Sequence, residues 1–229
     1  MKYPIHERFF SFQGEGVHQG RAAFFIRTFG CPIKCDWCDS AGTWHPKFRP
    51  QNINRLSARD LAMEAAEANP EFVVITGGEP CVHDLETLVE EIKLKRLPVH
   101  LETSGAFPTS ARFDWITVSP KEKAGLCLET IRKADELKII MDSPEAHEVW
   151  LDRLKSAGLT EWPKSIWLHP EWSKRNEPKT LWAISEAVKS AKAPRLRAGW
   201  QVHKMYKADA LDVRSLAPTP LGGQIEKGF

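Results

Sequence analysis

Short apolar runs, rich in β-branched and aromatic residues, alternate along this chain with longer stretches in which apolar residues recur every three or four positions. The short runs predict strands at 22–30, 71–76, 97–105, 115–121, 137–141, 165–170 and 196–203. The longer stretches predict helices at 57–70, 83–96, near 145–157 and near 179–192. Helices between most of the strands imply right-handed β–α–β crossovers and a parallel sheet. We therefore predict an α/β fold, an incomplete (β/α) barrel of about six mostly parallel strands, too few to close an eightfold barrel.

The same periodicity predicts how the helices begin and which faces they bury. Ser57 stands at an N-cap position with Asp60 three residues on, which is the spacing of a capping box. One face of the helix at 83–96 carries Leu85, Leu88, Val89 and Ile92. In the helix near 145–157, the residues predicted to face the core are Val149, Trp150 and Leu154.

Length and composition agree with one globular domain. The 229 residues suffice for a single large core, and 42% hydrophobic with 27% charged residues is ordinary for such a protein. We assign residues 1–206 to the core domain. The Pro- and Gly-rich stretch 207–229 is predicted to be a loosely ordered tail.

Charge and hydropathy exclude several classes of partner. The 32 basic and 30 acidic residues are interleaved and leave a net charge of +2, so we expect no nucleic-acid partner. The longest apolar stretches are a handful of residues, far short of a membrane span. The first residues lack the apolar core of a signal peptide, so we expect a cytoplasmic protein whose cysteines are free thiols or metal ligands.

Three of the five cysteines, Cys31, Cys35 and Cys38, fall within eight residues. A closed structural zinc site takes four Cys or His ligands, and His45 is the nearby residue that could complete one. An iron–sulfur cluster held by three thiolates explains the count better, because its fourth iron then stays open for a substrate or cofactor. Cys81 and Cys127 are predicted to be small buried hydrophobes.

Polar motifs follow the predicted strands: Arg27 late in the first, then TGGEP, ETSG, SPK, HPEW and QVHK. Parallel α/β sheets bind ligands at the carboxyl ends of their strands, so these motifs should ring one mouth. Arg27 lies within the apolar run FFIRTF, where a guanidinium requires a buried anion. We favour an anionic ligand over a pairing with a surface acid.

The spacing C-x3-C-x2-C, with Trp37 before the last cysteine and TGGEP after the next strand, resembles the radical S-adenosylmethionine (SAM) enzymes. The resemblance implies a 4Fe-4S cluster on Cys31, Cys35 and Cys38, whose open iron chelates the methionine end of SAM. Reduction of the cluster then cleaves SAM to a 5′-deoxyadenosyl radical. Backbone carbonyls or Glu79 would accept hydrogen bonds from the ammonium of SAM.

From residue 3 to about 206, the motifs YPIHE, FQGEG, FIR, VITGGEPC, ETSG, VSPK and QVHK resemble the 7-carboxy-7-deazaguanine synthase family. That family rearranges 6-carboxy-5,6,7,8-tetrahydropterin to 7-carboxy-7-deazaguanine with loss of ammonia, in the biosynthesis of the queuosine precursor. The resemblance implies Mg²⁺ as a further cofactor and regeneration of SAM in each turnover. It also implies a homodimer and an electron donor such as flavodoxin or ferredoxin.

The same resemblance implies roles for individual residues. Ser40, two residues after the last cysteine, would be the Mg²⁺ ligand. SAM would contact Trp37, Cys38, Asp39, Gly78, Ser119, Pro120, Lys121, His169, Pro170, Glu171 and Trp172. The pterin would contact Phe12, Gln13, Gly14, Arg27 and Thr76, with Glu15 and Glu102 as further candidates.

Two other functions stay open at this point, and the first of them uses the same cysteine spacing. A glycyl-radical activase would dock a large protein, and its sequence should lack a pocket for a small carboxylate. A non-catalytic iron–sulfur module would hold the cluster without responding to SAM. The sequence assigns no role to His203. In some members of the resembled family the C-terminal carboxylate approaches the substrate. This chain continues past QVHK, so we do not expect that contact here.

Overall fold

The computed structural model describes residues 1–192, 194–208 and 211–216. In this part of the chain one nine-stranded sheet runs in the order β3-β1-β2-β4-β5-β6-β7-β8-β9. From β2 to β9 all neighbours are parallel, whereas β1 is antiparallel to both β2 and β3. The strands are β1 (Lys2–Phe12), β2 (Ala22–Thr28), β3 (Asn54–Ser57), β4 (Phe72–Gly77), β5 (Val99–Thr103), β6 (Trp115–Val118), β7 (Glu136–Met141), β8 (Ser165–Pro170) and β9 (Leu196–Ala198).

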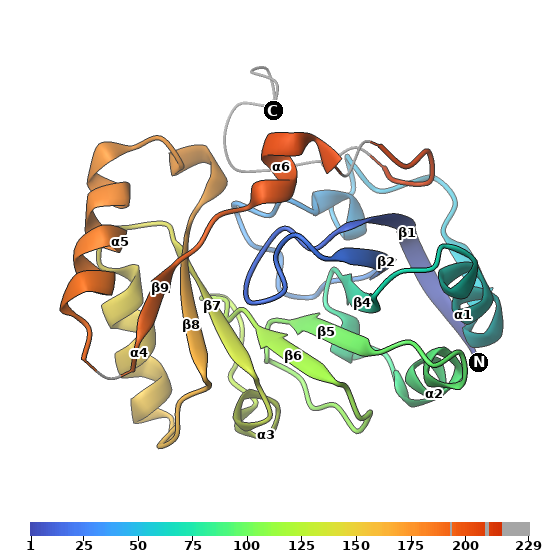
Figure 1. Cartoon of the computed structure of the whole chain (residues 1–229), viewed down its shortest axis with the longest axis horizontal. Helices are drawn as coiled ribbons and strands as arrows, with labels where there is room; N and C mark the ends of the chain where they lie inside the picture. The colour runs from blue at the N-terminus through green and yellow to red at the C-terminus, as the bar shows by residue number, and fades with distance from the viewer. Residues whose placement is uncertain (193, 209–210, 217–229) are drawn as a thin grey trace.

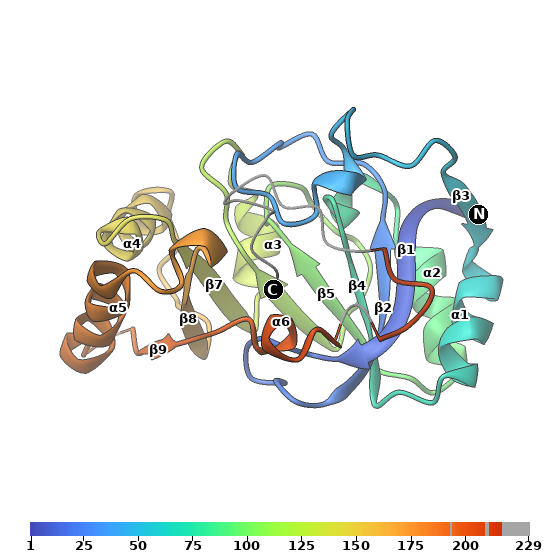
Figure 2. The ribbon, with the colours of Figure 1, turned by 90° about the horizontal axis from the view of Figure 1, so that it is seen from above.

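The sheet curves without closing, because its edge strands β3 and β9 stand at opposite ends of the strand order. Five helices cover its outer side and a sixth, α6, lies across the opening opposite them (Figure 1). Figure 2 shows the same opening from above, with α6 between the two ends of the sheet. The helices are α1 (Ala58–Glu67), α2 (Glu86–Leu94), α3 (Leu128–Arg132), α4 (Ala146–Ser156), α5 (Pro178–Ser190) and α6 (Val202–Tyr206).

The predicted incomplete barrel is confirmed, with differences at its two ends. All seven predicted strand segments belong to the parallel set, and the structure adds β1 and β3. The apolar alternation of β1 is broken at its middle, so that strand is hard to recognise from pattern alone. The segment 196–203 was predicted as one strand, but only Leu196–Ala198 pairs with β8 before the chain turns into α6.

The helix predictions hold except at one residue. The hydroxyl of Ser57 accepts a hydrogen bond from the backbone N–H of Asp60 at 3.1 Å, as the N-cap requires. The α2 residues predicted to form one face are buried, as are Trp150 and Leu154 of α4. Val149 is 60% exposed, so its predicted inward position is wrong; its neighbour Trp150 takes the core-facing place.

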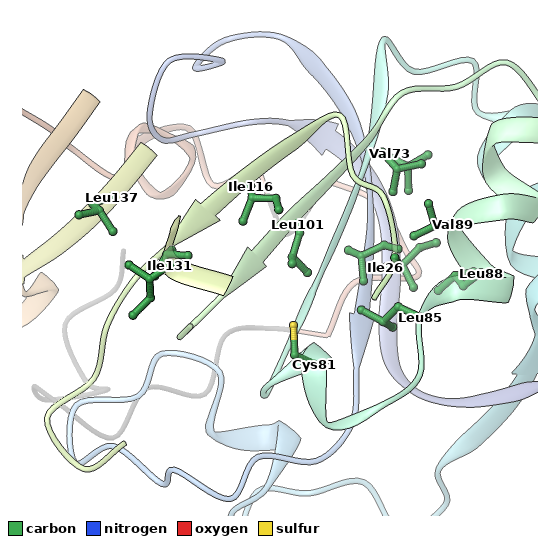
Figure 3. Close-up of a cluster of buried hydrophobic side chains, with 14 of the residues drawn as sticks. Ile26, Val73, Cys81, Leu85, Leu88, Val89, Leu101, Ile116, Ile131 and Leu137 are labelled. Carbon is green, nitrogen blue, oxygen red and sulfur yellow. The ribbon is translucent and has the colours of Figure 1, made fainter. Parts of the chain in front are cut away.

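One large hydrophobic core lies between the outer face of the sheet and the helices (Figure 3). Ile26, Val73 and Leu101 enter it from neighbouring parallel strands, and Leu88 enters it from α2. Cys81 belongs to this core, which confirms its predicted role as a small buried hydrophobe. Among the described residues no helix combines the length and the apolar character that crossing a membrane requires.

A smaller aromatic group closes the amino-terminal end of the barrel. The ring of His100 stacks on Phe72, with centroids 4.0 Å apart and an interplanar angle of 16°, and His18 packs against both. Burial, assisted by the neighbouring His18 and Arg21, lowers the pKa of His100 to about 3. The ring therefore stays neutral in the folded protein well below the pH at which it would take up a proton in the unfolded chain.

This shift predicts an acid-sensitive part of the folding free energy. Below the unfolded pKa of about 6.5, the unfolded state binds a proton that folded His100 refuses, and stability falls as the pH falls. His100→Phe keeps the stacked ring and removes the titration. Between pH 7 and pH 5, urea unfolding should show wild type losing about 2 kcal/mol more than the variant. Equal losses would mean that His100 contributes no acid sensitivity.

Candidate active site

A cavity of about 200 Å³ opens inside the curved sheet, where the carboxyl ends of the strands meet the cysteine loop. The FQGEG loop after β1 and the first residues of α6 form further walls. Many of the predicted site residues lie on this one surface: Phe12, Gln13, Gly14, Glu15, Arg27, Cys31, Cys35, Trp37, Cys38, Asp39, Ser40, Thr76, Gly78, Glu102, Ser119 and Lys121.

The three clustered cysteines face this cavity together from a loop fastened at both ends. The N–H of Gly30 donates to the carbonyl of Thr43 at 2.9 Å, and the N–H of Glu79 donates to the carbonyl of Gly30 at 2.9 Å. The indole N–H of Trp44 points at the sulfur of Cys38 at 3.5 Å. Burial raises the pKa of all three thiols, that of Cys38 to about 11. A bound metal would supply the positive charge that keeps them as thiolates.

The arrangement suits an iron–sulfur cluster better than a single metal ion. Across the described residues, no three His, Cys, Asp or Glu side chains converge as ligands of one ion. In a 4Fe-4S cluster each cysteine binds a different iron, so the three sulfurs line a shared space without converging. His45, the candidate fourth zinc ligand, instead accepts from the N–H of Lys47 at 3.2 Å and packs between Trp44 and Phe48.

The GGEP loop after β4 packs directly on the cysteine loop. A side-chain carbon added at Gly78 would stand 2.3 Å from the carbonyl oxygen of Gly30 and 2.8 Å from the Cβ of Cys31. Only glycine allows this approach. Gly77 has a φ of +152°, and a side-chain carbon added there would stand 2.3 Å from the Oγ1 of Thr28. The two glycines therefore bring the strand end against the cluster-binding loop.

Glu79 holds this loop in place with both of its carboxylate oxygens. They accept from the N–H of Cys81 at 3.0 Å, the hydroxyl of Thr103 at 2.6 Å, and the N–H and hydroxyl of Ser104. The residue is 1% exposed. Glu79, one of the acceptors considered for the ammonium of SAM alongside the backbone carbonyls, joins the ends of β4 and β5.

Gln13, Glu102 and Thr76 form one connected polar wall of the cavity, which we call the acceptor wall. The side-chain amide of Gln13 donates to Glu102 at 2.9 Å, and its oxygen accepts from the N–H of Glu15 at 3.1 Å. The hydroxyl of Thr76 donates to the other oxygen of Glu102 at 3.4 Å. This wall presents carboxylate and amide oxygens, the acceptors that the N–H-rich edge of a heterocyclic ring requires.

Glu15 and Lys138 form an ion pair inside the barrel. Burial opposes the ionisation of Glu15, but the ammonium of Lys138 outweighs it and holds the pKa of Glu15 well below its usual range. The amide of Gln201 donates to the same carboxylate at 2.7 Å. A buried charge persists only with such pairing and hydrogen bonding, so these residues keep the loop after β1 inside the barrel.

A second ion pair ties α6 to the cysteine loop. The ammonium of Lys204 lies 3.0 Å from Asp39, which also accepts from Gln201 at 3.2 Å. Burial disfavours charged Asp39, but Lys204 outweighs that effect and holds its pKa well below the ordinary value. His203 packs so closely on Gly14 that a side-chain carbon added at Gly14 would stand 2.0 Å from the Nδ1 of His203. QVHK thus forms one wall of the cavity.

Arg27 reaches the cavity from β2 and is already paired. Its Nε donates to Glu7 at 2.6 Å and its Nη1 donates to Ser40 at 3.2 Å. The buried anion that its apolar strand requires is therefore supplied by Glu7, directly across from it on β1. Arg27 still lines the cavity, and it stands beside the residue predicted to bind Mg²⁺.

Five predicted SAM contacts do not line the cavity: Pro120 and the four residues at 169–172. His169 is fully buried beside Glu15, and within the described residues neither of its ring nitrogens has a hydrogen-bond partner. Glu171 accepts from the N–H of Ser173 at 3.1 Å and caps the turn that follows β8. The ring of Trp172 lies near Lys204, with the ammonium 4.9 Å from its centroid.

The sequence predictions assigned no role to several residues that line the cavity. Lys138 stands in ELKIIM as Arg27 stands in FFIRTF, so the same argument about a cation in an apolar strand would have found it. Glu7 and His6 lie on a strand that was not predicted. Gln201 and Lys204 belong to QVHK, whose position after a strand was the available indication.

The comparisons with known proteins agree with one another. The family model described as the radical SAM superfamily matches residues 25–159. A 7-carboxy-7-deazaguanine synthase from Flavobacterium psychrophilum is 34% identical over 88% of this chain and 90% of its own length. A 7-carboxy-7-deazaguanine synthase from Synechocystis is 46% identical over 63% of this chain and 68% of its own length. A crystal structure of QueE from Escherichia coli superposes with a TM-score of 0.76 at 29% identity, covering 89% of this chain and 95% of that one.

We predict that each of Cys31→Ala, Cys35→Ala and Cys38→Ala loses the cluster, because the described cavity brings these three thiols together. After anaerobic reconstitution, wild type should bind about four irons per chain and show the cluster's visible absorption. Each variant should lose both. Cys81→Ala and Cys127→Ala are the matched controls, since neither cysteine is among the described residues that line the cavity. Full iron content in any of the three variants would contradict the assignment.

Proposed function

Because the chain belongs to the radical SAM superfamily, and within it to the 7-carboxy-7-deazaguanine synthases, we propose that it rearranges 6-carboxy-5,6,7,8-tetrahydropterin to 7-carboxy-7-deazaguanine with loss of ammonia. The product is a 7-deazapurine, the queuosine precursor. One observation carries the proposal. A single cavity joins three cysteines to an acceptor wall for a pterin edge and to an arginine for a carboxylate.

The enzyme uses a 4Fe-4S cluster and SAM, as its superfamily does. The cluster would be held by Cys31, Cys35 and Cys38, and when bound it supplies the electron that cleaves SAM reductively. We assign the methionine end of SAM to the backbone near Gly78, which the two glycines of the GGEP loop bring against the cysteines. Lys121 donates to Ser119 at 2.5 Å and lies 5.3 Å from the centre of the Trp37 ring, which suits a SAM-facing group.

The pterin is proposed to bind between the acceptor wall and Arg27. Glu102, braced by Gln13 and Thr76, would accept from the amide N–H and exocyclic amine of the ring. Phe12 and Gly14 place apolar surface and a close backbone beside the ring plane. Arg27 would bind the carboxylate, since a guanidinium is permanently charged and offers several N–H groups in one plane. The same cavity carries hydrogen-bond acceptors and Arg27, the groups that a small carboxylated heterocycle requires and that a protein-activating enzyme has no need of.

Mg²⁺ is proposed to bind at Ser40 together with the substrate. A hydroxyl alone is a weak ligand, and Mg²⁺ completes its shell with substrate oxygens and water. Ser40 faces the cavity beside Arg27 and lies 3.4 Å from the Oδ1 of Asp39. Because Mg²⁺ and the guanidinium repel each other, a carboxylate placed between them would stabilise both. The substrate's own carboxylate fits that position.

The wider assignments rest on the family. We propose a homodimer, a cytoplasmic location and an electron donor of the flavodoxin or ferredoxin type. The core domain is proposed to span 1–206, with a tail beyond it. Pro120 and the segment 169–172 remain proposed SAM contacts. The segment directly follows β8 at the same edge of the sheet as the other motifs, and Trp172 lies beside Lys204, which does line the cavity.

The proposed function is tested by anaerobic incubation of the reconstituted enzyme with SAM, dithionite, Mg²⁺ and 6-carboxytetrahydropterin. Mass spectrometry should show 7-carboxy-7-deazaguanine and ammonia, with SAM consumed in far less than stoichiometric amount because it is regenerated. A parallel incubation with a pterin lacking the carboxylate should give no deazapurine. SAM cleavage without deazapurine from any pterin would point to a different radical SAM reaction.

We further predict that Ser40→Ala separates substrate positioning from SAM cleavage. The radical must meet one particular C–H bond, and a displacement of about 1 Å can cost roughly a hundredfold in rate. The variant should form product at least about tenfold more slowly and lose most of its response to Mg²⁺. Reductive cleavage to 5′-deoxyadenosine should remain detectable by chromatography. Loss of SAM binding along with turnover would show that Ser40 acts on SAM and not on Mg²⁺.

A further inference from the structure

Strand β1 changes the face to which its side chains point at His6. Its pairing with β2 runs from Ile5 opposite Thr28 directly to Glu7 opposite Arg27, so His6 is the extra residue of a β-bulge. Before the bulge, Tyr3 and Ile5 pack in the large core on the helix side of the sheet. After it, Phe9 packs in a separate cluster with Phe25 on the barrel side, and Glu7 lines the cavity.

The bulge thereby places a carboxylate where uninterrupted alternation would have turned it toward the helices. Successive strand residues point to opposite faces, so Tyr3, Ile5, Glu7 and Phe9 would otherwise share one face. Glu7 is only 6% exposed, and burying a carboxylate is unfavourable unless it is paired. Bulges are frequent beside active sites, where they redirect a side chain.

Both oxygens of Glu7 are bonded, and to different parts of the chain. One accepts from the Nε of Arg27 at 2.6 Å. The other accepts from the backbone N–H of Leu216 at 2.6 Å and from the hydroxyl of Ser215 at 3.3 Å. Arg27 in turn donates from Nη1 to Ser40 at 3.2 Å. Bonds at two adjacent nitrogens fix the plane of the guanidinium.

The segment 211–216 has its own anchors on the neighbouring elements. Asp212 accepts from the backbone N–H of Phe10 on β1 at 2.9 Å. Arg214 pairs with Asp212 at 2.5 Å and with Glu64 of α1 at 2.9 Å. Leu216 then reaches the cavity. Figure 2 shows this segment, at the red end of the colour scale, running beside β1.

We propose that Glu7 is a positioning residue for the reaction: it fixes the guanidinium of Arg27 for the substrate carboxylate, and the segment 211–216 holds Glu7 in turn. The proposal rests on the function proposed above. Glu7 does not add affinity for an anion, because its own negative charge repels an incoming carboxylate. Its contribution is orientation, which keeps the guanidinium aligned before the substrate arrives.

This role predicts that Glu7→Gln lowers turnover without weakening the apparent affinity for the pterin. The amide has one oxygen and one NH₂ group, whereas Glu7 accepts hydrogen bonds on both sides, so one contact must be lost. Turnover should fall by roughly tenfold or more, because the guanidinium is no longer aligned. The KM for 6-carboxytetrahydropterin should not rise, because a repelling charge is gone. More 5′-deoxyadenosine should be released per product formed.

A second variant and a matched control accompany this measurement. Leu216→Pro removes the N–H that holds Glu7 and keeps the carboxylate, so it should lower turnover in the same direction by a smaller factor. Glu71→Gln is the control: Glu71 also accepts from an arginine Nε (Arg21, 2.8 Å) and from a backbone N–H (Ala22, 3.3 Å), but at the exposed amino-terminal end of β4, away from the cavity. The turnover and the KM of this control should match those of wild type.

Iron content and SAM affinity of each variant establish that the protein is intact. If wild type forms the deazapurine and Glu7→Gln turns over at the wild-type rate, the positioning role is overturned and the proposed function stands. A KM that rises with turnover unchanged would make Glu7 a binding group and would overturn it as well. If wild type itself forms no deazapurine, the proposed function fails and this inference fails with it.

Discussion

The ion pair between Glu15 and Lys138 holds the loop after β1 inside a barrel that does not close, and the active site depends on that loop. Seven parallel strands leave an opening between the two ends of the sheet. The loop fills the interior, where Gly16 adopts a φ of +68° against Glu136 and the N–H of Val17 donates to the same carboxylate at 3.1 Å. A charge buried in this way is stable only with its partner, so the loop has one position.

Because the loop is fixed, two distant parts of the chain are fixed with it. The N–H of Val202 donates to the carbonyl of Gly14 at 3.0 Å, which docks α6 on the loop. From α6, Gln201 reaches both Glu15 and Asp39, the residue after the last clustered cysteine. The cluster-binding loop and the acceptor wall thus share one hydrogen-bonded frame. A radical reaction requires such a frame, since a misplacement of about 1 Å between the radical and the reacting carbon can cost roughly a hundredfold in rate.

Much of this arrangement could be predicted from sequence because it is recorded in local pattern. The parallel strands follow from apolar runs, and TGGEP, FQGEG and the cysteine loop carry the glycines and thiols that the site requires. What could not be predicted depends on contacts between distant residues. A bulge at His6 leaves no periodic trace, and the partner of Arg27 is a glutamate twenty residues earlier. Likewise, the complete burial of His169 beside Glu15 depends on the position of the loop after β1, which the local pattern of HPEW does not record.

Three basic side chains of the cavity are each paired with an acidic side chain from another segment of the chain. Arg27 of β2 pairs with Glu7 of β1, Lys138 of β7 pairs with Glu15 of the loop, and Lys204 of α6 pairs with Asp39 of the cysteine loop. The pairs whose carboxylates are buried, Glu7 and Glu15, contribute little net stability, since the loss of hydration offsets the attraction. They do fix the position of one element relative to another, because a partner displaced by an ångström leaves a buried charge uncompensated. The open barrel cannot use strand closure to set these distances, so charge pairing across its interior sets them instead.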